Sequence, residues 1–428
     1  IARDGNAVLE MSPLAMTVGA DTWGVDEKRP GVSRRSVDSV VEFLVKRKYA
    51  STPDRYNELT LRYKDHDIQF RVYDNGVAYR FVSTTDNPSP VDSETVAYRF
   101  GDDPETITLL TNELQNWYEH DYTFKALSEL PVDSFSVTPV MVDRAGVKML
   151  IADANLYDYP GMYLKPVDGG FDAVFANYPD KEVQADGDNK IYAETRHPYL
   201  IPRAGKRAFP WRATGLFDNA GDIVTDELVY LLSDGPDAGA DFSWVKPGNI
   251  LWDWWNDRNI YGVDFKSGIN TETFMYLVDY AARHGIEYVL LDEGWSARND
   301  LLTLADGVDV PAICRHAGEK GVGVMLWAKW PNVLRQMEDA FGLFEEWGVK
   351  GVKVDFMDRN DAKMVRFFED VARCAARHRL MVDFHGSYPN EGMRRRYPNL
   401  MTREGGLGLE YNKWSDRATP RHDVIIPY

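Results

Sequence analysis

The chain has 428 residues, which is long enough for two or three domains, each with its own hydrophobic core. Its formal net charge of −18 argues against nucleic acid and anionic membrane surfaces as partners, since both are bound through basic patches. Hydrophobic residues make up 44% of the chain and aromatic residues 13%, which excludes a disordered protein.

The cysteine content and the length of the apolar runs exclude further classes of protein. Cys314 and Cys374 are the only cysteines, which excludes a disulfide framework and a zinc-type cysteine cluster, and we predict that both are buried free thiols. No apolar run reaches the roughly 18 to 20 residues that span a bilayer, so we expect no membrane insertion. The first residues carry no signal-peptide pattern, and a processed chain would look the same.

Residues 1–247 alternate apolar and polar side chains with a period of two. Asp74, Asn75 and Gly76 supply a hairpin turn between two such segments. This pattern predicts a large antiparallel β domain over residues 1–247. The alternation is clearest at Leu59, Leu61, Tyr63, Ile68, Phe70, Val72, Val77, Tyr79 and Phe81.

From residue 248 the period changes, and short apolar runs alternate with amphipathic helical stretches. Strand–helix units of roughly 30 residues predict a catalytic (β/α)8-type TIM barrel over residues 248–428. About six strands are present where such a barrel has eight, so we expect a truncation after about the sixth strand. The predicted strands lie in Ile250–Trp255, Ile286–Asp292, Val322–Trp327, Gly348–Arg359, Met381–His385 and Leu400–Arg403. The predicted helices are Thr271–His284, Val310–Lys320, Val333–Trp347 and Asp361–His378.

Ionisable residues follow successive predicted strands. Because the C-terminal ends of parallel barrel strands meet on one face, a ring of such residues indicates an active site. A single one is more often a structural ion pair or a solvated rim group. The ring consists of Asp253, Asp292, Glu293, Lys329, Lys353, Asp355, His385, Arg403 and Glu404.

Asp355 is the member of this ring that the pattern favours for chemistry. Lys353 lies two residues earlier on the same strand face, where its charge keeps a carboxylate ionised. Such a carboxylate attacks an anomeric carbon or stabilises an oxocarbenium ion. The alternative is a buried Lys–Asp pair without chemistry. Asp358 and Arg359 are predicted to pair or to cap the following helix.

Glycoside hydrolysis needs a second carboxyl group, which protonates the leaving oxygen. Candidates are Glu404 and Glu410 in the stretch 403–412, whose glycines allow close approach to a ligand. Surface exposure is the alternative for both glutamates. Their carboxylates are also suited to Ca²⁺, which prefers oxygen ligands.

Two residues fit either a sugar site or the core. Trp295 follows Asp292 and Glu293, and an aromatic platform beside a carboxylate is typical of hexose pockets, whereas core packing is the other interpretation. His385 either hydrogen-bonds a sugar hydroxyl or packs against the sixth strand. No glycine-rich phosphate loop follows a strand, and no Ser/His/Asp order stands out.

Three motifs occur in order along the chain, at Leu290–Trp295, Lys353–Arg359 and Thr402–Asn412. Together with Tyr159–Met162 and His422–Val424 they resemble glycoside hydrolase family 97. The resemblance covers nearly the whole chain. It implies an N-terminal β-super-sandwich domain followed by the catalytic barrel, and it also implies a periplasmic or secreted enzyme.

The family contains inverting α-glucosidases and retaining α-galactosidases. Its retaining branch carries an aspartate nucleophile at the end of the fourth strand, where this chain has Asp355. Its inverting branch uses a base glutamate just after the fifth-strand histidine, where this chain has Gly386. The resemblance therefore implies a retaining exo-α-galactosidase that acts on a small α-galactoside or an oligosaccharide. The alternatives are an inverting α-glucosidase of the same family and a non-catalytic carbohydrate-binding protein.

The resemblance also implies roles for single residues. Glu410 matches the general acid/base of the family, and we expect its carboxyl group about 5 to 5.5 Å from that of Asp355. Glu404 matches a calcium ligand, Glu119 is the best match for a ligand from the N-terminal domain, and with Glu410 they form the implied Ca²⁺ site. The residues expected to hold the sugar are Asp253, Asp292, Trp295, Lys329, Lys353, His385 and Asn412.

Overall fold

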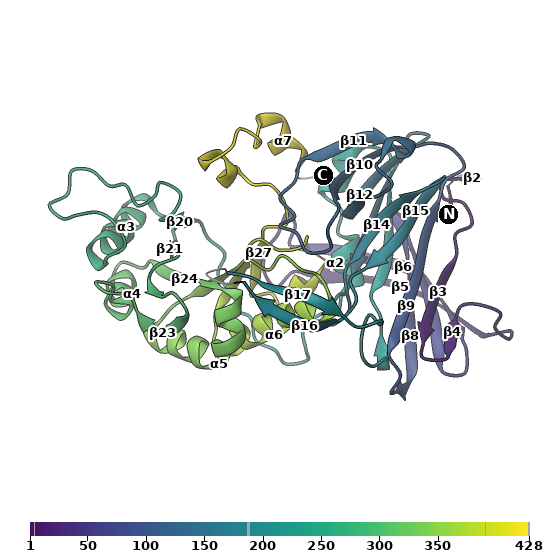
Figure 1. Ribbon diagram of the computed structural model, residues 1–428, viewed down its shortest axis with the longest axis horizontal. Helices are drawn as coiled ribbons and strands as arrows, with labels where there is room; N and C mark the ends of the chain where they lie inside the picture. The colour runs from purple at the N-terminus through teal and green to yellow at the C-terminus, as the bar shows by residue number, and fades with distance from the viewer. Residues whose placement is uncertain (4, 186–188, 390, 427–428) are drawn as a thin grey trace.

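The computed structural model describes residues 1–3, 5–185, 189–389 and 391–426. A β-rich half formed by the N-terminal part of the chain lies beside a half that contains parallel strands and helices (Figure 1). The predicted division at residues 247 and 248 falls in a segment, 233–249, that contains neither helix nor strand. These domain bounds stay a prediction.

Within the described part of the chain, fifteen strands of the β-rich half form one sheet, and all of its strand pairs are antiparallel. The predicted hairpin is confirmed, since Tyr73 pairs with Gly76 and leaves Asp74 and Asn75 at the turn. The strands are β3 (Leu14–Val18), β4 (Asp21–Trp23), β5 (Gly31–Glu42), β6 (Ser51–Arg62), β7 (His66–Tyr73), β8 (Gly76–Asn87), β9 (Val91–Arg99), β10 (Glu105–Thr111), β11 (Tyr122–Ala126), β12 (Phe135–Arg144), β13 (Val147–Ala154), β14 (Met162–Val167), β15 (Gly170–Phe175), β18 (Gly205–Ala208) and β19 (Trp211–Phe217).

Smaller elements complete this half. A hairpin of two strands, β16 (Pro179–Gln184) and β17 (Ile191–Arg196), extends from the large sheet towards the parallel strands (Figure 1). The others are the pair β1 (Ala2–Arg3) and β2 (Asn6–Ala7), the 3-10 helix η1 (Leu127–Glu129) and the helices α1 (Ala220–Val224) and α2 (Leu228–Leu232).

In residues 248–389 and 391–426, six parallel strands form a second, curled sheet, and their spatial order follows the chain. The predicted strand–helix repeat is therefore confirmed. The strands are β20 (Ile250–Trp252), β21 (Tyr288–Leu291), β24 (Gly323–Lys329), β25 (Gly351–Asp355), β26 (Met381–Phe384) and β27 (Leu400–Arg403). The remaining elements are α3 (Thr271–His284), β22 (Ser296–Ala297), β23 (Asp300–Leu304), α4 (Val310–Glu319), α5 (Trp330–Trp347), α6 (Ala362–Arg377), η2 (Met393–Arg395), η3 (Leu409–Lys413) and α7 (Pro420–Ile425).

Local chemistry explains where these elements begin and end. The side chain of Asn270 accepts a hydrogen bond from the backbone N–H of Thr273 and caps α3, which ends at Gly285 with a φ of 69°. The first parallel strand is shorter than predicted, because the chain turns after Trp252 and Asp257 adopts a φ of 55°. Helix α5 begins earlier than predicted because Pro331 favours its first turn.

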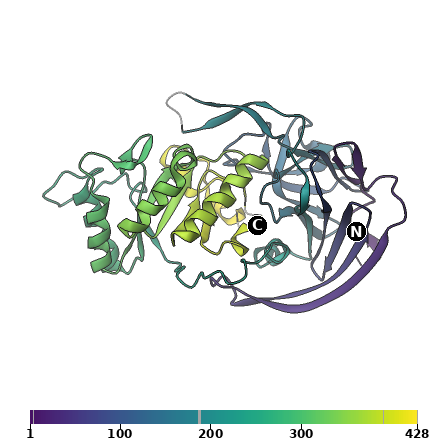
Figure 2. The same ribbon diagram turned by 90° about the horizontal axis from the view of Figure 1, so that it is seen from below.

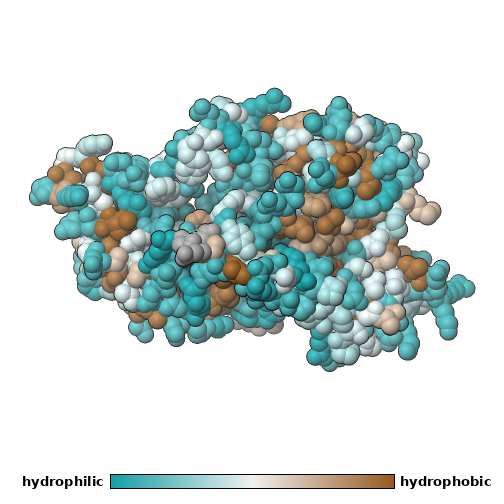
Figure 3. Space-filling model, in the orientation of Figure 1, coloured by the Kyte–Doolittle hydropathy of each residue, from teal (hydrophilic) through white to brown (hydrophobic). Residues whose placement is uncertain are grey.

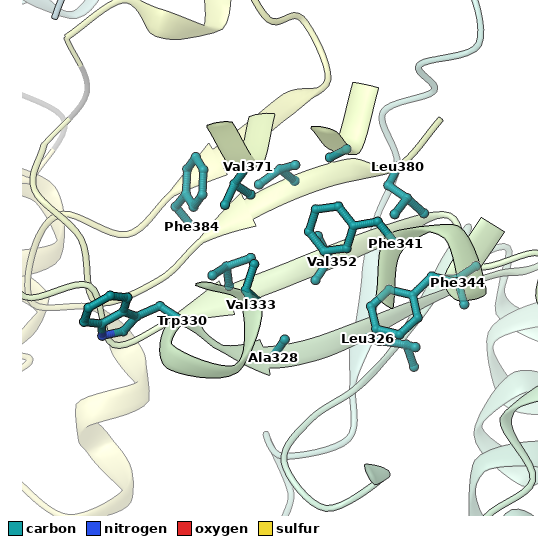
Figure 4. Packing of buried hydrophobic residues seen from close by; sticks show 14 of the residues in the cluster. Leu326, Ala328, Trp330, Val333, Phe341, Phe344, Val352, Val371, Leu380 and Phe384 are labelled. Carbon is teal, nitrogen blue, oxygen red and sulfur yellow. The ribbon is translucent and has the colours of Figure 1, made fainter. Parts of the chain in front are cut away.

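The core of this half lies between the sheet and its helices. Side chains of α5 and α6 pack against the outer face of the central strands (Figure 4). In β25, Val352 and Val354 belong to this core, so Lys353 and Asp355 project to the opposite face. Both cysteines of the chain, Cys314 and Cys374, are buried free thiols, as predicted.

The segment that follows β25 joins the two halves. Backbone N–H of Asn116 in the β-rich half donates to the carbonyl oxygen of Asp358 at 2.9 Å. The Arg359 guanidinium is 1% exposed and pairs at 2.8 Å with both Asp361 and Glu182. Because Glu182 lies on β16, this buried ion network fixes the end of β25 to the β-rich half.

The face of the molecule in Figure 3 is mostly hydrophilic, and its hydrophobic residues gather in small patches. Among the described residues, no helix has both the length and the apolar composition needed to cross a membrane.

We predict that Arg359→Met destabilises the protein by about 1–3 kcal/mol, because it removes the buried guanidinium that hydrogen-bonds both Asp361 and Glu182 and leaves Arg196 and Lys363 as their remaining cations. Urea unfolding followed by tryptophan fluorescence measures the loss. Arg55→Met is the matched control, since Arg55 pairs with Asp38 on the surface, where such pairs contribute about 0–1 kcal/mol. Equal losses in the two variants would contradict the prediction.

Candidate active site

A pocket with a volume of about 550 Å³ lies where the C-terminal ends of the parallel strands meet the β-rich half. Strands β24 and β25 and the turns after β20, β21 and β26 provide most of its wall. The β-rich half adds Trp117 and Glu119. The lining residues are Trp117, Glu119, Trp254, Arg258, Ile269, Asp292, Glu293, Gly294, Trp327, Lys353, Asp355, Phe356, His385, Glu410, Tyr411 and Trp414.

Asp355 is the last residue of β25 and is 5% exposed. Its Oδ2 accepts a hydrogen bond from Trp327 Nε1 at 2.9 Å and lies 3.5 Å from Lys353 Nζ. Its Oδ1 accepts a hydrogen bond from the backbone N–H of Phe356 at 2.7 Å. Burial alone would raise the pKa of Asp355, but the charges of His385 and Lys353 hold it well below its usual range. The side chain is therefore an ionised carboxylate at neutral pH.

Lys353 connects Asp355 to a second carboxylate. Its Nζ lies 3.1 Å from Asp292 Oδ2 and 4.2 Å from the ring centroid of Trp252. Trp252 Nε1 donates to the same oxygen of Asp292 at 2.6 Å. Burial opposes the charge of Lys353, but Asp355 and Asp292 together raise its pKa above the ordinary value, so it remains an ammonium group.

Glu410 reaches the pocket from η3. Trp254 Nε1 donates a hydrogen bond to its Oε1 at 2.8 Å, and its Oε2 lies 3.8 Å from His385 Nε2. Burial raises the pKa of Glu410 above its ordinary value, against the opposing charges of Lys353 and His385. A carboxyl group that holds its proton more tightly than usual is suited to general acid catalysis.

His385 stands among the carboxylates of the pocket. Its Nδ1 lies 2.8 Å from Glu404 Oε2 and 3.5 Å from Asp355 Oδ1. Burial opposes its charge, but the carboxylate of Asp355 raises the pKa of His385 well above the ordinary value. An imidazolium between these groups compensates their negative charge.

Three glutamates gather at one side of the pocket. The ligand atoms of His385, Glu404 and Glu410 lie within 4.8 Å of one another. Glu119 hydrogen-bonds Tyr411, and burial together with the charge of Glu404 raises the pKa of Glu119 to about 8. A bound cation would offset the repulsion between these partly buried carboxylates. The three glutamates offer oxygen ligands, which Ca²⁺ prefers.

The structure does not bring all of the predicted sugar-binding residues into the pocket lining. Asp253 is 1% exposed, and its carboxylate accepts hydrogen bonds from Arg258 Nε at 2.7 Å and from the backbone N–H of Asp292 at 2.9 Å. Burial raises the pKa of Asp253 to about 6 against the charge of Arg258. Asp253 thus orients Asp292. Lys329 is also buried, with its Nζ 3.2 Å from Asn189 Oδ1, and Asn412 is exposed.

Of the two interpretations of Trp295, a sugar platform or a core residue, the structure supports the core residue. It is fully buried, packs edge-on against Phe344 and donates from Nε1 to the carbonyl oxygen of Trp327 at 2.7 Å. Gly294, the residue before it, lines the pocket. Trp295 therefore supports the strand position from which Trp327 contacts Asp355.

The pocket also contains residues that sequence reasoning did not single out for the site. Trp254 and Arg258 follow β20 directly, and Trp254 was assigned to a strand rather than to a ligand contact. Tyr411 and Trp414 lie near Glu410 in sequence, which was the available signal. Asp358 and Arg359 were predicted to pair or to cap the following helix, and they pair, Asp358 with Lys190 and Arg359 with Asp361 and Glu182. The cap of α6 is Asp361.

Comparisons with known proteins agree with this geometry. The pattern of the family described as Glycoside hydrolase 97 matches residues 254–406, and the pattern described as Glycosyl-hydrolase 97 N-terminal matches residues 1–235. A protein of Bacteroides thetaiotaomicron named "Retaining alpha-galactosidase" is 37% identical, and the alignment covers 100% of this chain and 67% of the relative. A "Probable retaining alpha-galactosidase" of Streptomyces bingchenggensis is 28% identical, and the alignment covers 100% of this chain and 64% of that relative.

A solved family 97 enzyme of Pseudoalteromonas sp. strain K8, in complex with acarbose, shares the fold with a TM-score of 0.83 at 23% identity. The match covers 97% of this chain and 67% of that enzyme. The chain thus spans about two thirds of the length of the curated relatives it matches. The two family patterns and the 37% identity show that this chain belongs to glycoside hydrolase family 97.

Proposed function

We propose that this protein is a retaining exo-α-galactosidase, which hydrolyses terminal α-galactosides through a covalent glycosyl-enzyme. The observation that carries the proposal is that one pocket contains two carboxyl groups whose pKa values are shifted in opposite directions. The charges of His385 and Lys353 keep Asp355 ionised, whereas burial raises the pKa of Glu410 above its ordinary value, and both residues line the same pocket. An ionised nucleophile and a protonated acid are the two groups that a retaining glycosidase needs. The names of both curated relatives support the choice of α-galactosides.

The reaction consists of two displacements. In the first, an oxygen of Asp355 attacks the anomeric carbon, the glycosidic C–O bond breaks, and Glu410 gives its proton to the leaving oxygen. In the second, Glu410 takes a proton from water, the water oxygen attacks the anomeric carbon, and the bond to Asp355 breaks. Two inversions release galactose in the α configuration.

Gly386 supports the retaining mechanism over the inverting α-glucosidase alternative. It has a φ of 55°, and a Cβ built on it would lie 3.4 Å from Asp355 Oδ1. A glutamate at this position, which the inverting mechanism requires, would meet backbone strain and a second negative charge beside Asp355. The non-catalytic alternative lacks support, because Asp355 and Glu410 share the pocket.

The calcium assignment belongs to the same proposal. Glu119, Glu404 and Glu410 would hold Ca²⁺, and their mutual repulsion supports a cation there. When bound, the ion supplies a fixed positive charge that orients Glu410. The predicted sugar ligands Asp292, Lys353 and His385 line the pocket and are suited to binding galactose hydroxyls.

We also propose a type for each of the two domains and a cellular location for the protein. The six parallel strands, in chain order and separated by helices, support a (β/α)8-type barrel. The large antiparallel sheet supports a β-super-sandwich. Family membership is the support for a periplasmic or secreted enzyme, and fractionation of cells of the source organism tests it.

We predict that NMR of an aryl α-galactoside reaction detects α-galactose as the first-formed anomer, because two displacements restore the configuration. An aryl α-glucoside is the control and should react slowly. If β-galactose appears first, a single displacement operates and the role of Asp355 as nucleophile must be withdrawn.

We predict that Glu410→Gln lowers kcat/KM about 10²- to 10⁴-fold for substrates with a sugar leaving group, which needs a proton from the enzyme. The loss should be smaller for an aryl galactoside whose acidic phenol leaves unaided. Glu293→Gln is the control, since Glu293 lines the same pocket and takes no part in the mechanism. Equal losses for both leaving groups would argue against Glu410 as the acid.

We predict that chelation of calcium lowers activity, that added Ca²⁺ restores it, and that Glu119→Gln raises the Ca²⁺ concentration required. The physical reason is that Glu119 provides one of the carboxylates of the site. Calorimetric titration of the chelator-treated protein with Ca²⁺ measures the affinity. Glu113→Gln is the control, because Glu113 is exposed on the same segment. Unchanged affinity in Glu119→Gln would remove Glu119 from the site.

A further inference from the structure

A second cluster of metal-binding side chains lies away from the pocket. Glu338 projects from α5, Cys374 lies in the last turns of α6, and His378 follows directly after α6. One ligand atom from each residue lies within 4.8 Å of the others. We propose that Glu338, Cys374 and His378 bind a divalent transition-metal ion of the zinc type, which ties α5 to α6.

The two helices are placed for such a link. Helices α5 and α6 lie side by side on the outer face of the parallel sheet (Figure 2). Cys374 and His378 are four residues apart, so both side chains project from one face of the end of α6. The sulfur of Cys374 lies 3.3 Å from Glu338 Oε2, and Nε2 of His378 lies 3.5 Å from Glu338 Oε1.

The orientation of His378 is the independent observation that points to a ligand. Its Nδ1 lies 2.8 Å from Glu345 Oε2, on the next turns of α5. Its Nε2 is buried and faces Glu338 Oε1 at 3.5 Å, in an arrangement that lacks the geometry of a hydrogen bond. A carboxylate that holds one imidazole nitrogen while the other faces sulfur and carboxylate ligands is the arrangement found around metal-bound histidines.

The donor set selects the class of metal. One thiolate, one imidazole and one carboxylate suit Zn²⁺, with water as the fourth ligand, whereas Ca²⁺ prefers oxygen alone. This separates the cluster from the group of Glu119, Glu404 and Glu410. On binding, the thiol of Cys374 loses its proton to solvent and its sulfur bonds to the metal.

Arg377 is the competitor for this site. Its Nη2 pairs with Glu338 Oε2 at 2.6 Å, and its side chain is 52% exposed. Because the pair is at the surface, its contribution is small and the arginine can move into water when a metal replaces it. The same side chains without a metal would form an ordinary ion network, and the experiment must separate these two states.

Titration of the reduced, chelator-treated protein with Co²⁺ tests the proposal. Excess Ca²⁺ is present to occupy the carboxylates of the pocket. We expect one equivalent of Co²⁺ to produce the near-ultraviolet absorption of a cobalt–thiolate bond, and Zn²⁺ to abolish it. This absorption reports a bond to cysteine sulfur, which carboxylate sites elsewhere on the protein do not provide.

Cys374→Ser should abolish the absorption, and Cys314→Ser, which removes the other buried thiol, should leave it unchanged. Glu345→Gln should keep the absorption but weaken Co²⁺ binding about 10- to 100-fold, because it releases the orientation of His378. Circular dichroism checks the fold of each variant. Absence of the absorption in the unmodified protein, or its persistence in Cys374→Ser, would overturn the proposal.

Discussion

The ammonium group of Lys353, buried between Asp292 and Asp355, is the interaction on which the site depends. Lys353 is 2% exposed and Asp355 5% exposed, so neither charge would be stable there alone. The period of β25 makes the pair possible, because Val352 and Val354 anchor the strand in the core while the alternate residues face the pocket. Removal of the lysine would leave two buried carboxylates facing each other. The pKa of Asp355 would then rise, because only the charge of His385 would remain to offset its burial.

Tryptophan side chains orient the carboxylates that this charge balance keeps in place. Trp252, Trp254 and Trp327 donate their indole N–H groups to Asp292, Glu410 and Asp355 respectively. An indole donates and cannot take a proton back, so it holds one carboxylate oxygen in a fixed direction without competing for protons. Its ring also fills space that water would otherwise occupy. A pocket built in this way is apolar around a few aligned charges, which is the setting in which electrostatic stabilisation of an oxocarbenium ion is strongest.

Sequence periodicity predicted the parts of this arrangement that depend on local order. The alternation in β25 placed Lys353 beside Asp355, and α3 has the predicted bounds. The role of Trp295 depends on the carbonyl oxygen of Trp327, which is distant in sequence, so no local pattern distinguishes a sugar platform from a core residue. Cysteine counting excluded a cysteine cluster but could not show that Glu338 and His378 approach Cys374, because that contact requires α5 and α6 to pack together.

The site is a product of both halves of the chain rather than of the parallel strands alone. Phe356 has a φ of 73° and packs edge-on between Trp327 of β24 and Trp117 of the β-rich half. Its backbone N–H also donates a hydrogen bond to Asp355, so a residue whose position depends on the β-rich half directly contacts Asp355. The Arg359 ion network holds the same segment three residues later. A strained backbone conformation such as the positive φ of Phe356 persists only where surrounding contacts hold it in place. Here those contacts come from both halves of the chain, from Trp117 and from Trp327. The β-rich half therefore forms one wall of the candidate active site, to which it contributes Glu119 and Trp117.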